Sequence, residues 1–357
     1  MKLVANIKLQ PTPGQAQALL DTMEQANAAC NYISQVAWDS QTFGQFNLHK
    51  LTYHNVRERF PLTAQVVVRC NAKVADAYKL DRKTKREFRP HGSIAYDDRI
   101  LRYYPDQVSI WTTAGRMKVP FLTGERQREL LKTRKGETDL VYHNGSFFLN
   151  AVCEVDEPPT GDPKDFLGVD LGIVNIAVDS DGESFSGGHL NGLRKRHRKL
   201  RATLQKKGTK SAKRLLKKRK RKEGRFARNI NHTIAKRLVA KAKRTGRGIA
   251  LEDLKDIRSR IRARRPQRSK LSSWAFNQLG QFVSYKARMA GVKVVFVDPR
   301  NTSRTCPVCG NIDKLNRPNQ AIFSCTRCGF AGLADAIAAE NIRRVVVNQP
   351  HVATACS

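Results

Sequence analysis

The chain opens with an alternation of apolar and polar residues that predicts a β-strand. Every second residue across positions 3–9 is apolar, so one face of this segment can be buried. A helix start follows at once, because Thr12, Pro13 and Gln15 supply an N-cap, a first-turn proline and the glutamine of a capping box. Helical patterning then predicts three helices, at about 13–38, 50–59 and 63–79.

Short strands replace the helical pattern after this region. Alternating residues predict strands within 93–119 and a hairpin over 139–155, where Asn144 and Gly145 supply the positive φ angles of a type I′ turn. We expect these strands to take up the N-terminal strand in a small β-barrel or curled sheet. The polar, proline-rich stretch 156–164 that follows predicts a linker.

Beyond this linker, buried strands alternate with helices. Short apolar runs predict strands at 166–170, 173–178, 248–254 and 292–297. From Arg194 to Arg225, 18 of 32 residues are Lys or Arg, and interspersed leucines favour helices over an unstructured tail. The next helix is expected to be amphipathic, with apolar residues every fourth position from Phe226 to Leu238, and a further helix is expected at 272–290.

Charge then narrows the class of partner. The 357 residues contain 66 Lys and Arg against 31 Asp and Glu, a net charge of +35. Because this surplus is clustered, it favours a nucleic acid, whose phosphates exchange condensed counterions for Lys and Arg. No apolar stretch approaches the roughly 18 residues of a membrane span, and the first residues lack a signal-peptide core. We therefore expect a cytoplasmic protein of two or three domains with no membrane contact.

Four cysteines have the spacing of a metal site. Cys306 and Cys309 form one Cys-x-x-Cys pair, and Cys325 and Cys328 form another, each followed by a glycine. Two such knuckles facing each other give a tetrahedral thiolate site for zinc, with iron as the alternative metal. With four protein ligands there is no open position for a catalytic water, so the expected role is structural.

Three acidic residues lie where a hydrolytic metal site would need them. Asp170 ends a predicted strand, and the glycines at 168 and 172 would let a phosphodiester approach it. On the strand 248–254, Glu252 and Asp253 point to opposite faces, so the residues alone leave open which one joins Asp170. Asp335 opens a predicted helix after the cysteines. Together such carboxylates suit two-metal phosphodiester hydrolysis with Mg²⁺ or Mn²⁺.

These motifs resemble those of one known family. The similar segments are FLGVDLG (166–172), GIALEDL (248–254), DPRNTSRTCPVCG (298–310), CTRCGF (325–330) and ADAIAAENI (334–342). They are similar to the TnpB family of transposon-associated, RNA-guided DNA endonucleases, which are related to the small type V CRISPR effectors. The resemblance implies a catalytic set of Asp170, Glu252 and Asp335 that binds two Mg²⁺ ions, and it selects Glu252 over Asp253.

The resemblance also implies a fold class and a domain plan. It implies a multidomain α/β and α+β protein with an RNase H-like, RuvC-type nuclease core that is split by a zinc ribbon. A wedge β-barrel carrying a small helical recognition lobe would precede this core. The implied parts are the barrel (1–10 and 90–157), the helical lobe (11–89), the core (164–302 and 331–346) with its basic helical insertion (190–246), the ribbon (303–330) and a flexible tail (347–357).

The partners implied by the resemblance are nucleic acids. They are a guide RNA derived from the transposon end and a double-stranded DNA target beside a short motif, with a companion transposase encoded nearby. The resemblance also implies a prokaryotic protein that is associated with the nucleoid when on its target. Candidate contacts are Tyr53, Gln65 and Arg69 for duplex DNA and Arg264, in a basic loop, for the strand to be cut. The resemblance further implies that the basic helices, which carry Arg196 and Lys199, bind RNA. An ordinary surface or packing role is the alternative for each of them.

Three other functions compete with guided cleavage. A guide-dependent repressor would bind DNA without cutting it, but such relatives lose at least one of the three carboxylates. A transposase would join strands with similar carboxylates, and it would usually need a separate end-binding domain. An unguided RuvC-type nuclease or resolvase would act on naked substrate without bound RNA.

Overall fold

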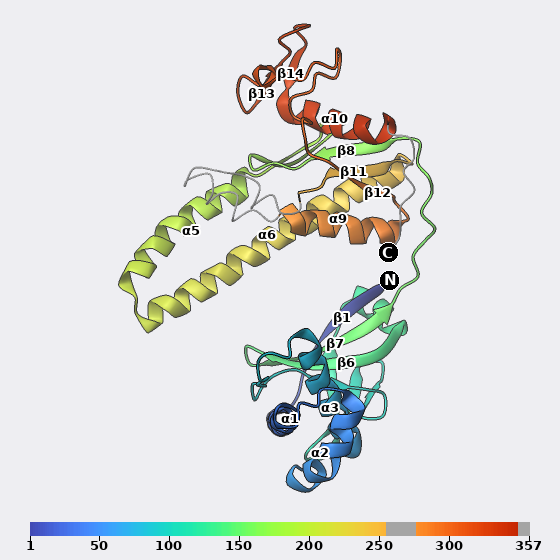
Figure 1. The fold of residues 1–357 in the computed structure, drawn as a ribbon, viewed down its shortest axis with the longest axis vertical. Helices are drawn as coiled ribbons and strands as arrows, with labels where there is room; N and C mark the ends of the chain where they lie inside the picture. The colour runs from blue at the N-terminus through green and yellow to red at the C-terminus, as the bar shows by residue number, and fades with distance from the viewer. Residues whose placement is uncertain (255–275, 349–357) are drawn as a thin grey trace. The chain divides into compact units, whose positions relative to one another are not determined.

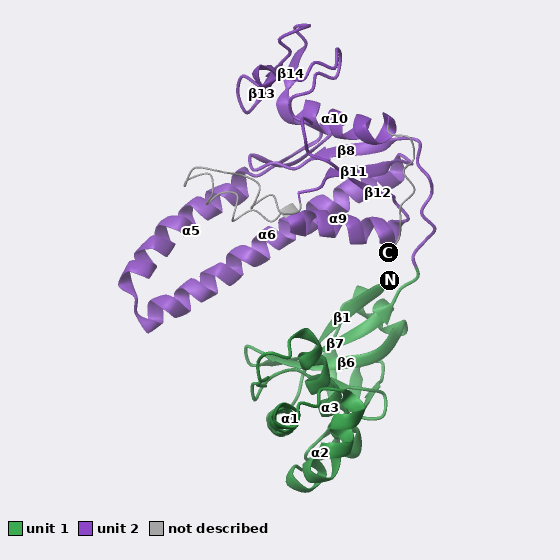
Figure 2. Ribbon diagram, in the orientation of Figure 1, with its two compact units in different colours: residues 1–156 green, residues 157–357 purple. Residues whose placement is uncertain are grey.

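The computed structural model describes residues 1–254 and 276–348. The chain divides into two compact units, 1–156 and 157–357, coloured separately in Figure 2. The division falls at the start of the predicted linker. Arg264 and the basic loop around it lie outside the described residues, as does the predicted tail beyond residue 348.

The first unit is built on a seven-stranded sheet with the order β2-β6-β7-β1-β5-β4-β3. Its strands are β1 (Lys2–Leu9), β2 (Ile94–Tyr96), β3 (Leu101–Tyr103), β4 (Gln107–Thr112), β5 (Gly115–Leu122), β6 (Arg134–His143) and β7 (Ser146–Glu154). The edge strands β2 and β3 are separated by only a short turn in the chain, so the sheet curls until it is nearly closed. The N-terminal strand pairs antiparallel with both β5 and β7, which confirms its predicted place in the curled sheet.

Local sequence signals account for the turns and helix ends of this unit. The β6–β7 hairpin turns at Asn144 (φ 50°) and Gly145 (φ 79°), as predicted. The capping box is also confirmed, because Thr12 Oγ1 accepts from the Gln15 backbone N–H while Gln15 Oε1 accepts from the Thr12 backbone N–H. A short helix, α4 (Glu125–Lys132), was not predicted.

Three helices share one hydrophobic core with the curled sheet. They are α1 (Pro13–Asp39), α2 (Gln45–Arg59) and α3 (Ala64–Leu80). Leu19 and Met23 of α1 belong to the same buried cluster as Ile7 of β1 and Ile110 of β4. The first unit is therefore held together by apolar packing between its helices and its sheet.

The second unit contains a five-stranded mixed sheet with the order β10-β9-β8-β11-β12. Its strands are β8 (Phe166–Asp170), β9 (Asn175–Asp179), β10 (Ser184–Ser186), β11 (Gly248–Glu252) and β12 (Val294–Val297). The strands β8, β11 and β12 are parallel, whereas β9 and β10 are antiparallel to their neighbours. The short strand β10 was missing from the prediction.

Helices cover both faces of this sheet (Figure 1). On one face, Leu167, Val169 and Leu251 are buried in a cluster with residues of α6 (Lys210–Arg244) and α9 (Phe276–Ala290). On the other face, Phe166 packs in a cluster with Ile342 of α10 (Ala334–Asn348). Successive residues of β8 thus alternate between two buried faces, as expected for a central parallel strand.

The basic region forms a helical hairpin made of α5 (Gly188–Lys207) and α6. The separate amphipathic helix expected after residue 225 is wrong, because the basic segment and the apolar stripe lie on one continuous helix of 35 residues. Gly224 stands at the change of pattern, and a single glycine weakens a helix by only about 1 kcal/mol. The ion pair of Lys241 Nζ with buried Asp179 Oδ2 (2.5 Å) ties the far end of α6 to the sheet. In the described ranges, no helix carries an apolar run long enough to cross a membrane.

Candidate functional site

The register of β8 and β11 places two of the three carboxylates side by side. Leu251 is paired with Val169 in this parallel ladder, so the next residues, Glu252 and Asp170, end the two strands next to each other. Leu251 is packed toward α6 and α9, and alternation therefore directs Glu252 to the face covered by α10. Asp253 lies one residue further on and is directed away from this face, so the geometry favours Glu252.

The helix α10 brings the third carboxylate to the same edge. It lies so close to β8 that a Cβ added at Gly168 would stand 2.0 Å from Ala339 O and 2.7 Å from Arg343 N. Asp335 lies one helical turn before Ala339, which is about 6 Å along α10. Asp170 lies two residues after Gly168, which is also about 6 Å along β8. The two carboxylates are thus about equally far from the contact between Gly168 and Ala339. Asp335 accordingly lies near enough for its charge to act on Asp170.

The interpretation of the two glycines beside Asp170 as space for the substrate was wrong. We expected Gly168 and Gly172 to clear space for a phosphodiester, but the space beside Gly168 is filled by the backbone of α10. A Cβ at Gly172 would meet Asn175 O at 2.6 Å, so this glycine also accommodates the protein's own chain. Both glycines serve the packing that assembles the site.

The electrostatics of the carboxylates favour a bound cation. Burial, together with the neighbouring charges of Glu252 and Asp335, raises the pKa of Asp170 to about 7. Burial also raises the pKa of Glu252, although the hydroxyl of Thr302 and the charge of Arg317 act in the opposite direction. Burial and mutual repulsion disfavour the ionised form of these carboxylates, and a bound divalent cation would stabilise that form. Carboxylate oxygens are hard ligands, which suit Mg²⁺ or Mn²⁺.

Three polar residues that the sequence did not single out contact these carboxylates. Thr302 Oγ1 donates to Glu252 Oε1 (2.6 Å), and Asn175 Nδ2 donates to Asp335 Oδ2 (3.0 Å). The guanidinium of Arg317 lies 3.2 Å from Asp335 Oδ1. Only Thr302 lay within a recognised motif, and nothing near Asn175 or Arg317 in the sequence marks them, because folding alone brings them here.

The four cysteines form a compact cluster, as predicted from their spacing. Their sulfur atoms all lie within 4.8 Å of one another, which makes them the described group best suited to a single metal ion. The two knuckles match: Gly310 N–H donates to Cys306 O and Gly329 N–H to Cys325 O, both at 3.0 Å. Both glycines adopt the left-handed backbone conformation, with φ angles of 72° and 73°. This arrangement fits a structural zinc site with thiolate ligands.

The folding of the cysteine ribbon positions Arg317 at the carboxylates. Buried Asn316 links the two knuckles, because its amide donates to Asn311 O (3.1 Å) and accepts from Thr326 N–H (2.9 Å). Arg317 is the next residue, and its guanidinium reaches Asp335. The four-cysteine site, which contains no catalytic ligand, is thus connected to the carboxylates through the turn that contains Asn316 and Arg317.

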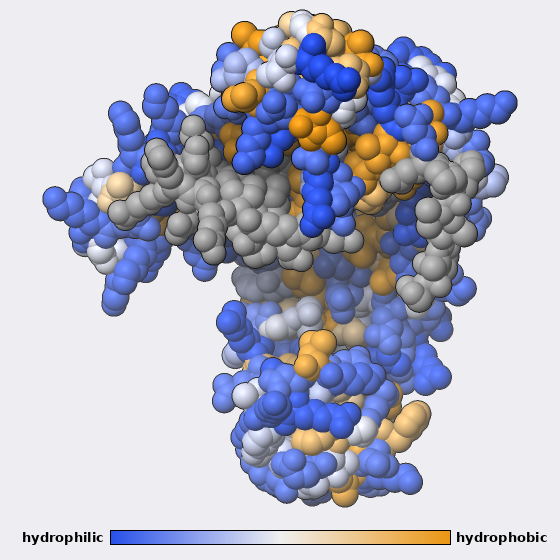
Figure 3. Space-filling view, turned by 45° about the horizontal axis from the view of Figure 1, so that its top comes forward, coloured by the Kyte–Doolittle hydropathy of each residue, from blue (hydrophilic) through white to orange (hydrophobic). Residues whose placement is uncertain are grey.

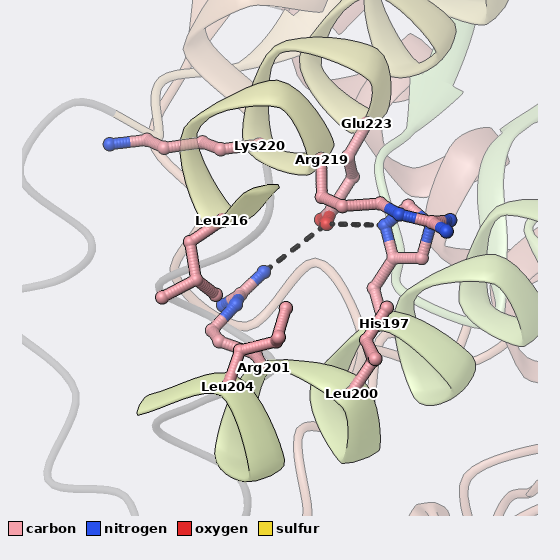
Figure 4. A pocket seen from close by; sticks show the side chains of 8 residues that line it. All are labelled: His197, Leu200, Arg201, Leu204, Leu216, Arg219, Lys220 and Glu223. Atoms are coloured by element: carbon pink, nitrogen blue, oxygen red, sulfur yellow. Dashed lines mark hydrogen bonds and ion pairs between the residues drawn. The ribbon is translucent and has the colours of Figure 1, made fainter. Parts of the chain in front are cut away.

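A single acidic residue joins the two basic helices (Figure 4). Glu223 of α6 contacts His197 Nδ1 and Arg201 of α5, both at 3.2 Å, and Arg194 Nε at 3.7 Å. The side chain of Glu223 is only 15% exposed, whereas most lysines and arginines around it are exposed, including the predicted RNA contacts Arg196 and Lys199. Figure 3 shows hydrophilic residues over most of the coloured surface, interrupted by smaller groups of hydrophobic residues. The hairpin therefore exposes a basic surface, and the ion pairs of Glu223 join its two helices along their inner seam.

The predicted duplex contacts in the first unit are engaged within the protein. Arg69 forms ion pairs with Glu137 and with Asp97, the latter at 3.5 Å. Gln65 accepts from Arg99 (2.9 Å) and donates to Asp97. Tyr53 is half-buried, with its ring centroid 4.7 Å from that of His49. These contacts give each of the three a packing role within its own unit.

Comparison with known proteins places these features in a family. Residues 150–256 match the family model described as "Probable transposase", and residues 276–342 match "Cas12f1-like, TNB domain". A TnpB-like protein of Methanocaldococcus jannaschii is 30% identical over 196 residues, which cover 50% of this chain and 69% of that protein. The chain belongs to the TnpB family. Other relatives of this TnpB protein are longer, and the matched regions span only part of them.

Two of these longer relatives are CRISPR-associated endodeoxyribonucleases named Cas12f1. The protein of Sulfoacidibacillus thermotolerans is 42% identical over 121 residues, 33% of this chain and 26% of its own length. That of Syntrophomonas palmitatica is 30% identical over 208 residues, 54% of this chain and 39% of its own length. A solved complex of Cas12f1 with single guide RNA and target DNA matches 93% of the TnpB chain and 83% of its own, with a TM-score of 0.62 at 16% identity. This likeness supports the fold.

Proposed function

We propose that this TnpB protein is an RNA-guided, Mg²⁺-dependent DNA endonuclease that cuts beside a short target-adjacent motif. The proposal rests above all on one observation: Asp170, Glu252 and Asp335, far apart in sequence, converge at one edge of the five-stranded sheet. The order β10-β9-β8-β11-β12 corresponds to 3-2-1-4-5 in chain order, which supports an RNase H-like, RuvC-type core. The endonuclease names of the Cas12f1 relatives support the same activity.

The site residues divide the work of hydrolysis. Asp170, Glu252 and Asp335 would hold two Mg²⁺ ions, which when bound would activate a water and stabilise the leaving oxygen. Asn175 would orient Asp335 through its amide, which donates to Asp335 Oδ2 (3.0 Å). The planar guanidinium of Arg317, which lies 3.2 Å from Asp335 Oδ1, would be placed to hold a phosphate oxygen of the substrate strand. The four cysteines would hold one zinc ion that fixes the ribbon and thereby Arg317.

The nucleic-acid partners follow from the distribution of charge. In an RNA-guided enzyme, base pairing reads the target sequence, while the protein binds backbone and a short duplex motif. The exposed lysines and arginines of α5 and α6, including Arg196 and Lys199, form a surface suited to RNA phosphates. The description "Probable transposase" supports a link to a transposon. On that basis we propose that the guide RNA derives from the transposon end and that a companion transposase is encoded nearby.

Copurified RNA and cleavage of a matched target would test the proposal together. The protein is expressed with its native flanking DNA, its RNA is sequenced, and the complex is mixed with Mg²⁺ and plasmids carrying the matched target beside a randomised flank. We expect a discrete RNA and cuts beside one enriched flank, which Asp170→Ala abolishes. Binding without cutting would support the repressor instead, and RNA-independent cutting of naked DNA would support an unguided nuclease.

Strand transfer is the second candidate, because the family model over residues 150–256 carries the description of a transposase. A transposase would join a DNA 3′ end to its target, whereas an endonuclease leaves free ends. Sequencing the products of the same reaction separates the two outcomes. Joined products that require Asp170 would replace hydrolysis by strand transfer in the proposal.

A further inference from the structure

The loop between β12 and the cysteine ribbon touches one of the three carboxylates. Thr302 in this loop is buried, and its Oγ1 lies 2.6 Å from Glu252 Oε1 and 3.1 Å from Pro299 O. A carboxylate and a carbonyl are both acceptors, so the threonine hydroxyl must act as the donor. Its shorter contact is the one to Glu252.

The position of Thr302 is fixed by α10. The amide nitrogen of Asn341 donates to Thr302 O and to Thr305 O, both at 2.8 Å, and Asn341 is itself only 5% exposed. Within the loop, the backbone N–H groups of Arg304 and Thr305 both donate to Asn301 O, at 2.9 and 3.0 Å. The threonine is therefore held by a tight turn on one side and by a buried amide on the other.

This arrangement connects two carboxylates through one helix. Asp335 and Asn341 both belong to α10, so the helix that carries one proposed metal ligand also anchors the loop that contacts another. We propose that Thr302 is a positioning residue that holds Glu252 Oε1, so that Oε2 is presented to the divalent cation, and that Asn341 holds Thr302 in place. This inference rests on the proposed function, in which Glu252 binds that cation.

Removing a hydrogen bond to a metal ligand typically lowers metal affinity or activity by about 10- to 100-fold. Thr302→Val removes the hydroxyl and keeps the side-chain shape, whereas Thr302→Ser keeps the hydroxyl. Thr305→Val is a matched control in the same loop, because the Thr305 hydroxyl donates to Asn301 O (2.9 Å). Each variant is prepared as the full chain with its copurified RNA.

The experiment measures Mn²⁺ binding by electron paramagnetic resonance. Only Asp170-dependent binding is counted, which is the binding that is absent when the complex carries Asp170→Ala. The Mg²⁺ concentration for half-maximal cleavage, the RNA affinity and the thermal midpoint are measured beside it. We expect Thr302→Val to weaken Mn²⁺ binding and raise the Mg²⁺ requirement at least tenfold, with RNA affinity and thermal midpoint equal to those of Thr305→Val. Thr302→Ser should stay within about threefold of wild type, since it retains the donor.

Two results would overturn the role of Thr302. The first is Mn²⁺ binding in Thr302→Val equal to that in Thr305→Val, and the second is equal impairment of Thr302→Val and Thr302→Ser, which would indicate packing. Failure of the proposed function is distinguishable from both. If wild type binds Mn²⁺ in an Asp170-dependent manner but cuts no DNA, the function fails while the Mn²⁺ titration still decides for or against Thr302.

Discussion

The contact between β8 and α10 predicts that Gly168→Ala impairs cleavage without touching substrate. The added Cβ would stand 2.0 Å from Ala339 O and 2.7 Å from Arg343 N, atoms of the α10 backbone. Cβ contacts normally begin near 3.4 Å, so α10 has to move away from β8 by about 1 Å or more. Overpacking of this kind costs about 1–3 kcal/mol of folding stability.

The same displacement moves Asp335 away from Asp170, because Asp335 lies on α10 and Asp170 ends β8. A misplacement of about 1 Å at a catalytic centre can lower the rate about 100-fold. We therefore expect a roughly 100-fold lower single-turnover cleavage rate, a lower thermal midpoint and unchanged RNA affinity.

The control for this substitution is Gly192→Ala on α5. No heavy atom lies within 4 Å of its added Cβ, so helix stability should rise slightly and cleavage should stay at the wild-type rate. Thermal unfolding, RNA binding by filter retention and single-turnover cleavage are measured for both variants. Cleavage and stability of Gly168→Ala equal to those of Gly192→Ala would refute the packing argument.

Three further predictions concern the ribbon, the carboxylates and the hairpin. The double variant Cys309→Ser/Cys328→Ser should lose its zinc, as measured by metal analysis. Its cleavage rate should fall at least tenfold, because Asp335 and Arg317 would be misplaced; a wild-type rate would contradict this coupling. The pKa of Asp170 is raised from 3.8 to about 7, so metal-free protein should lose stability as pH rises between these two values and stay at the lower level above 7. Asp170→Asn should therefore raise the thermal midpoint at pH 8, and an unchanged midpoint would argue that burial and carboxylate repulsion do not destabilise the ionised Asp170. Glu223→Gln should weaken RNA binding several-fold by loosening the hairpin, although it removes a negative charge; tighter binding would show that charge alone governs affinity.

Features encoded by neighbouring residues could be predicted from the sequence. The capping box at Thr12, the hairpin turn at Asn144 and the cysteine knuckles each depend on residues a few positions apart. The strands ending at Asp170 and Glu252 were equally predictable, because short apolar runs mark buried strands. Even so, the pairing of Glu252 rather than Asp253 with Asp170 required the register of β8 and β11.

Features that depend on contacts between distant segments could not be predicted. Asn175, Thr302 and Arg317 reach the carboxylates from three different segments, and no local pattern marks any of them as a partner of these carboxylates. The role of Gly168 was misread for the same reason, since the partner that requires a glycine is a helix some 170 residues later in the chain. Likewise, the ion pairs of Arg69 with Asp97 and Glu137 could not be predicted, because both acidic partners lie on other segments.

The origins of the three carboxylates differ, and this difference has a consequence for the site. Asp170 and Glu252 are placed by adjacent strands, so backbone pairing within the sheet fixes them independently of the ribbon. Asp335 is placed by α10, which follows the ribbon in the chain and contacts the sheet at Gly168. Disturbing the ribbon should therefore remove Asp335 and Arg317 from the site while the other two carboxylates stay in register, so the ribbon controls completion of a site that the sheet has already begun.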